Sequence, residues 1–99
     1  MRFEQHVERA LASLPPQLAK ALQNVAIVVE DENPEDPDLL GLFEEEEYLP
    51  AKVTIYRLPL VESFPDPAEL EREIRITVLH ELAHYFGTDE DRLDELGYG

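Results

Sequence analysis

Residues 66–87 read DPAELEREIRITVLHELAHYFG, and this stretch organises the rest of the chain. Asp66 suits a helix N-cap, Pro67 suits the first helical position, and Gly87 suits the left-handed position that ends a helix. Apolar residues recur between them every three to four positions. We therefore predict one helix of about 20 residues, roughly 30 Å long, which would cross a small domain. Its apolar positions are Leu70, Ile74, Val78, Leu79, Leu82, Ala83 and Phe86.

The predicted helix contains the motif His80-Glu81-Leu82-Ala83-His84. Histidines four residues apart project from one helical face and can bind one metal ion through two imidazole nitrogens. The glutamate between them is then placed to take a proton from a metal-activated water. The two histidines lie about 40° apart on a stripe separate from the apolar face. The motif predicts a zinc site with His80 and His84 as ligands and Glu81 as general base.

Glu73 and Thr77 lie on the same stripe as the two histidines, roughly two turns and one turn earlier, respectively. Either side chain could orient a ligand ring through a hydrogen bond, as groups around metal sites often do. We expect both residues to be ordinary helix surface instead.

A catalytic zinc ion usually takes three protein ligands, so a third is needed. The chain has no cysteine, which leaves imidazole and carboxylate. His6 falls in a predicted N-terminal helix, and we expect it at the surface rather than at the metal. Glu90 occupies the position where longer zinc motifs carry a third histidine. We predict Glu90 as the third ligand, with Asp89 and Asp91 as alternatives; all three acids would also suit the start of a following helix.

The remaining segments alternate between helical and strand patterns. The apolar run at 25–29 is typical of an internal strand that is buried on both faces. Residues 52–58 lie between Pro50 and Pro59, which favours an edge strand, and an edge beside a metal site could bind an extended peptide. The other predicted elements are helices over 3–14, 17–23 and 90–96 and a short strand over 39–43.

Length and composition are consistent with one small folded domain over residues 1–99. The chain is 43% hydrophobic, and it shows neither the apolar run of a signal peptide nor a stretch long enough to span a membrane. We expect a cytoplasmic protein of the α+β class. The sequence leaves its oligomeric state open.

The formal net charge is −15. Such a charge repels the phosphates of nucleic acids and anionic membrane surfaces, so we expect neither as a partner. It attracts basic peptides or proteins over long range, although solubility alone could account for most of the acids. Ten acidic residues and no basic one lie within residues 30–47, as either a lid over the site or a solvated loop.

The chain resembles the zincin-like metallopeptidases, in particular a small bacterial family of minimal zincins. The resemblance rests on residues 80–87, HELAHYFG, and on residues 91–98, DRLDELGY. It extends upstream through residues 25–30, 40–42 and 53–57, and so covers nearly the whole chain.

The resemblance implies a minimal zincin-like fold, in which a small mixed sheet packs against a long active-site helix, with further helices at the N-terminus. It implies that His80 and His84 bind zinc, that Glu81 is the catalytic glutamate, and that an acid at position 90 replaces the third histidine. The family more often carries Asp at that position, and the Met-turn of the larger metzincins is missing, because Met1 is the only methionine.

Two functions remain open from the sequence. The first is a zinc-dependent metallopeptidase that hydrolyses peptide bonds with a metal-activated water. The second is a zinc-stabilised acidic binding module with little or no turnover, which the small size and high charge favour.

Overall fold

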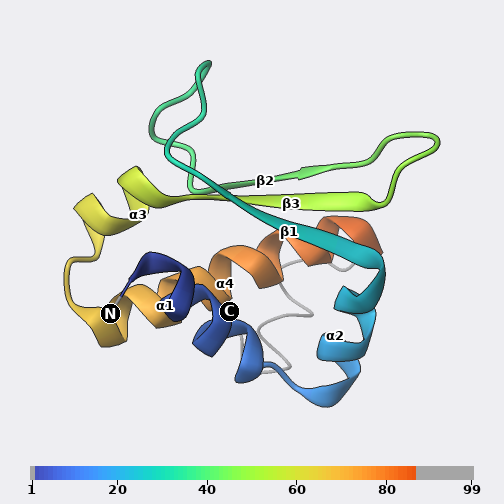
Figure 1. Ribbon diagram of the computed structural model, residues 1–99, viewed down its shortest axis with the longest axis horizontal. Helices are drawn as coiled ribbons and strands as arrows, with labels where there is room; N and C mark the ends of the chain where they lie inside the picture. The colour runs from blue at the N-terminus through green and yellow to red at the C-terminus, as the bar shows by residue number, and fades with distance from the viewer. Residues whose placement is uncertain (1, 87–99) are drawn as a thin grey trace.

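The computed structural model describes residues 2–86, which form a three-stranded sheet and the helices around it. Helices α1, α2 and α4 lie on one side of the sheet, and α3 follows the end of β3 (Figure 1). This arrangement confirms the predicted α+β class. In chain order the elements are α1 (Phe3–Ala12), α2 (Pro16–Ala21), the 3-10 helix η1 (Leu22–Asn24), β1 (Val25–Glu30), β2 (Gly41–Glu44), β3 (Ala51–Tyr56), α3 (Arg57–Ser63) and α4 (Pro67–Phe86).

The sheet is mixed, with the strand order β1-β3-β2. Strand β1 runs parallel to β3, and β2 runs antiparallel to it. The order corrects two predictions, because β3 lies in the centre and β1 at an edge of the described sheet. Pro50 precedes β3 and Pro59 follows it, so neither removes a hydrogen bond from the ladder. Five of the six β3 residues are buried, whereas only Val25 is buried in β1.

Helix α3 replaces the last two residues of the strand predicted over 52–58. The chain turns into helix at Arg57, and Pro59 occupies the third helical position. Proline is tolerated there because the first backbone N–H groups of a helix have no partner within it. A proline at position 59 is compatible both with the end of a strand and with the first turn of a helix. The sequence therefore did not predict α3.

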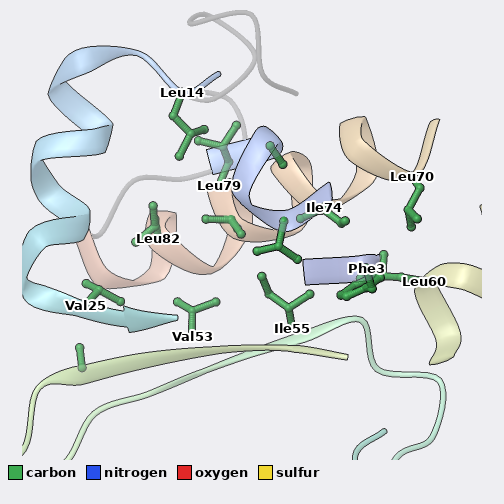
Figure 2. Packing of buried hydrophobic residues seen from close by; sticks show 14 residues of the cluster. Phe3, Leu14, Val25, Val53, Ile55, Leu60, Leu70, Ile74, Leu79 and Leu82 are labelled. Carbon is green, nitrogen blue, oxygen red and sulfur yellow. The ribbon is translucent and has the colours of Figure 1, made fainter. Parts of the chain in front are cut away.

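Helix α4 runs from Pro67 to Phe86, as predicted, and packs against α1, β2 and β3. Ile74 and Val78 are completely buried, and Figure 2 shows the apolar side chains of α4 between α1 and the inner face of β3. From β3, Val53 and Ile55 meet this layer and are also fully buried. Among residues 2–86 no helix combines the length and apolar character needed to cross a membrane.

The start of α4 is capped as its sequence predicts. The backbone N–H of Glu69 donates a hydrogen bond to Asp66 Oδ2 at 3.1 Å, and Leu70 N–H bonds to the Asp66 carbonyl at 2.8 Å. The side-chain bond satisfies one of the donors that a helix N-terminus leaves open. The opposite end of α4, where the motif lies, is therefore held by burial and not by this cap.

Helix α1 packs along α4 and closes the core from the far side. Its buried apolar residues are Phe3, Val7 and Ala10. The helix ends at Ala12, two residues before the predicted boundary, and Ser13 Oγ donates to the Ala10 carbonyl at 2.7 Å. The helix predicted over 90–96 lies outside the described residues.

Candidate metal centre

The motif lies in the last two turns of α4, facing the start of β2. His80 and Glu81 are half-buried, and their neighbours Leu79 and Leu82 are fully in the core. This alternation places the two polar side chains at the boundary between core and solvent. A cavity of about 340 Å³ opens beside them. Its lining comprises Asp36, Asp38, Leu39, Leu40, Gly41, Thr77, His80 and Glu81.

His84 lies one helical turn after His80 in α4, and its side chain is outside the described part of the structure. Side chains four apart on a helix have Cβ atoms roughly 5–6 Å apart, which lets two imidazoles reach one ion. Imidazole nitrogen is a common zinc donor, so the donor chemistry of the pair fits zinc. Within residues 2–86 no group of three or more His, Cys, Asp or Glu side chains could hold a metal ion. The predicted third ligand Glu90, with Asp89 and Asp91, lies outside these residues.

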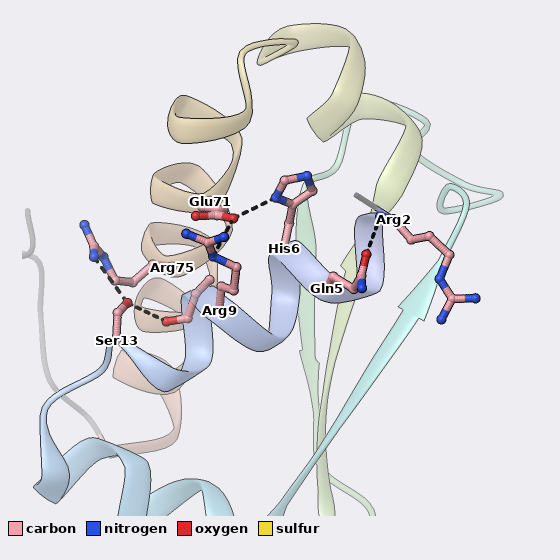
Figure 3. Close-up of polar contacts among 8 residues, drawn as sticks. Arg2, Gln5, His6, Arg9, Ser13, Glu71 and Arg75 are labelled. Carbon is pink, nitrogen blue, oxygen red and sulfur yellow. Dashed lines mark hydrogen bonds and ion pairs between the residues drawn. The ribbon is translucent and has the colours of Figure 1, made fainter.

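His6 is buried between α1 and α4, which corrects the prediction of a surface histidine. It is 7% exposed, and its Nδ1 donates to Glu71 Oε1 at 2.8 Å (Figure 3). The same carboxylate oxygen lies 3.2 Å from Arg9 Nε. Glu71 precedes His80 by nine residues, or roughly 13 Å along a helix. His6 therefore joins the two helices and stands apart from the candidate metal centre.

The acidic segment between β1 and β2, residues 31–40, lines part of the cavity and is bonded to the end of β3. Asn33 Nδ2 donates to the Tyr56 hydroxyl at 3.0 Å, and Asn33 Oδ1 accepts from two backbone N–H groups of the same loop. Asp31 pairs with Arg57 at 2.9 Å. These contacts hold the loop to the end of β3, and its Asp36 and Asp38 line the cavity. Loop 31–40 is thus bonded to the end of β3, and most of its residues are exposed to solvent.

The second half of the acidic segment has a different environment. Glu45, Glu46 and Glu47 follow β2 and are exposed in the segment that leads to β3. Glu44 lies 3.6 Å from Lys52 on the neighbouring strand. Residues 45–47 are therefore exposed to solvent, whereas Glu44 belongs to β2.

Thr77 corrects the expectation of ordinary helix surface. It is 8% exposed and lies where α4 meets Gly41 of β2. Glu73, one turn earlier, is half-buried. Gly41, Asp36 and Asp38 were not predicted as cavity residues, because they come from a loop and a strand that only the fold brings to the helix. Their sole signal was the density of acids in this segment.

A family model described as zincin-like metallopeptidase matches residues 22–99. The chain belongs to the zincin-like metallopeptidase family. The match includes η1, the sheet, α3, α4 and the motif, and it begins immediately after α2. No curated protein gives a significant match to this zincin-like chain. Membership implies a zinc-dependent peptidase in general terms, and the mixed sheet on a long helix is compatible with a minimal zincin-like fold.

Proposed function

We propose that this chain is a zinc-dependent metallopeptidase in which His80, His84 and Glu90 hold the metal and Glu81 is the general base. The observation that carries the proposal is the placement of His80 and Glu81 on one cavity, in a chain that belongs to the zincin-like family. The assignment of His84 and Glu90 rests on the sequence motif.

Zinc, when bound, acts as a Lewis acid and lowers the pKa of a water ligand to about 7. The protein's own chemistry then falls to Glu81. Its carboxylate lines the cavity, where it takes a proton from the attacking water and delivers it to the departing amine. Half-burial in α4 restricts the motion of this side chain, which favours proton transfer along one direction.

Strand β2 is the element best placed to bind the peptide. It begins at the cavity with Gly41 and forms an edge of the described sheet. An extended peptide can add to such an edge through main-chain hydrogen bonds and so lie across the site. This role replaces the one predicted for residues 52–58, which form the central strand.

We propose further that the substrate carries basic side chains close to the scissile bond. Asp36, Asp38 and Glu81 place three carboxyl groups on the cavity, and among the described residues its lining contains no Lys or Arg. The net charge of −15 would also steer basic peptides towards the protein.

The experiment measures zinc content and cleavage of a mixed peptide library for the wild type, Glu81→Gln and Glu81→Ala. We expect near-stoichiometric zinc in all three and a loss of cleavage of at least about 100-fold in both variants. Glu69→Gln, an exposed glutamate in the first turn of α4, is the matched control and should cleave like the wild type.

Zinc-loaded protein without Glu81-dependent cleavage would refute the peptidase and favour the zinc-stabilised acidic binding module. Folding without bound metal, undisturbed by a chelator, would refute both functions.

A further inference from the structure

Gly41 is the point of closest approach between β2 and α4. A Cβ atom added there would lie 2.6 Å from Thr77 Cγ2, 3.3 Å from the Thr54 carbonyl oxygen and 3.6 Å from Glu81 Cγ. A separation of 2.6 Å is shorter than real Cβ contacts allow. The φ angle of Gly41 lies outside the left-handed region. Glycine is therefore required for space and not for backbone conformation.

The atoms around Gly41 have little room to give way. Thr77 is β-branched and lies in a helix, where few χ1 rotamers are available, and it is 8% exposed. The helix behind it is fixed, since Ile74 and Val78 are completely buried against the rest of the core. The Thr54 oxygen belongs to the backbone of the central strand. A larger residue at position 41 would therefore displace the start of β2.

The same contact is adjacent to the proposed base. Thr77 and Glu81 are four residues apart in α4 and so project from neighbouring positions on one face. Both line the cavity together with Gly41. The gap between the backbone of β2 and Glu81 is thus set at the Gly41–Thr77 contact.

We propose that Gly41 and Thr77 are positioning residues, which set the depth at which β2 lies against α4 and thereby place a β2-bound peptide relative to Glu81. The proposal rests on the proposed peptidase function. Neither residue supplies a reacting atom, and the two act as a steric pair: the missing Cβ of one accommodates the methyl group of the other.

The test is a double-mutant cycle with Gly41→Ala and Thr77→Ser, because serine lacks the Cγ2 methyl. Gly41→Ala should lower the Tm by about 5–15 °C, as overpacking does. At 25 °C it should lower kcat/KM by about tenfold or more in the folded, zinc-loaded protein, with zinc affinity unchanged within about threefold. Adding Thr77→Ser should recover at least half of the Tm loss and return kcat/KM to within about threefold of Thr77→Ser alone.

Thr77→Val is the matched control, since it keeps the methyl group and loses the hydroxyl. It should not rescue Gly41→Ala. The proposal is overturned if Gly41→Ala matches the wild type, if its loss persists with Thr77→Ser, or if valine rescues as well as serine.

A readout without turnover separates this proposal from the peptidase function. Backbone amide shifts of His80 and Glu81, measured on zinc-free protein, should move in Gly41→Ala and return in Gly41→Ala/Thr77→Ser. If the wild type shows no Glu81-dependent cleavage, the peptidase function fails. The Tm values of the double-mutant cycle and these amide shifts then decide whether the Gly41–Thr77 contact positions the face of α4 that carries Glu81. Amide shifts that do not move in Gly41→Ala would overturn the positioning role.

Discussion

Two histidines of this chain lie in different surroundings, His6 buried and His80 half-buried. His6 lies between two helices, and its ring donates to Glu71, so its hydrogen-bonding capacity serves the packing of α1 on α4. His80 lies at the rim of the core and faces a cavity with Glu81. A half-buried ring beside open space can bind a ligand, whereas a buried ring bonded to a carboxylate stabilises the fold.

The two rings should therefore respond differently to removal. His80→Ala should weaken zinc binding by at least about 100-fold, because even residues that only support a ligand cost 10- to 100-fold. His6→Ala should leave zinc affinity within about threefold and lower the free energy of unfolding by about 1–3 kcal/mol, since the half-buried Glu71 carboxylate loses one of its two partners and keeps only Arg9. Competition with a chromogenic chelator and urea unfolding in EDTA measure the two effects. Equal loss of zinc in both variants would contradict the assignment.

At the scale of elements, α4 has a capped first turn and carries the motif in its last two turns. Asp66 accepts a hydrogen bond from the Glu69 N–H, whereas the motif lies about 20 Å further along the helix. The helix was predictable because caps, periodicity and the motif all agreed within one segment. The strands were predicted in position but not in order: proline placement and apolar runs are local signals, and the order of strands depends on contacts between distant segments.

Loss of the Asp66 cap should lower the free energy of unfolding and leave zinc affinity unchanged. Asp66→Ala should lower the free energy of unfolding by about 0.5–2 kcal/mol, as loss of an N-cap side chain does. Zinc affinity should stay unchanged, given the distance. Glu62→Ala, which removes an exposed carboxylate from α3, should change stability by no more than about 0.5 kcal/mol. Urea unfolding checks both, and equal destabilisation by the two variants would show that the cap is not responsible.

At the scale of the whole molecule, the acids are numerous but not equivalent. Loop 31–40 is held to β3 and α3 by Asn33 and Asp31, which places Asp36 and Asp38 at the cavity. Glu45, Glu46 and Glu47, between β2 and β3, are exposed and are not among the residues that line the cavity. The two groups would contribute alike to long-range attraction of the proposed basic substrate, and only Asp36 and Asp38 would contact a side chain bound in the cavity.

The double variant Asp36→Asn/Asp38→Asn should lower the preference for Lys- and Arg-containing peptides over neutral ones by roughly 3- to 10-fold in kcat/KM, as expected for exposed charge pairs. The variant Glu45→Gln/Glu46→Gln removes the same charge and should change the preference by less than about twofold. Matched peptide pairs at two salt concentrations measure the effect. A similar loss in both variants would assign the preference to net charge alone.

The sequence by itself determined the long helix, its N-cap, the α+β class and the motif residues His80, Glu81 and His84, because each of these is encoded within one contiguous segment. Only the tertiary structure decided that β3 is central, that His6 is a buried link to Glu71, and that Gly41, Thr77, Asp36 and Asp38 meet at the cavity. These features depend on which distant segments bury one another's surfaces. Apolar periodicity predicts that a residue is buried against another element, but it does not predict which element that is.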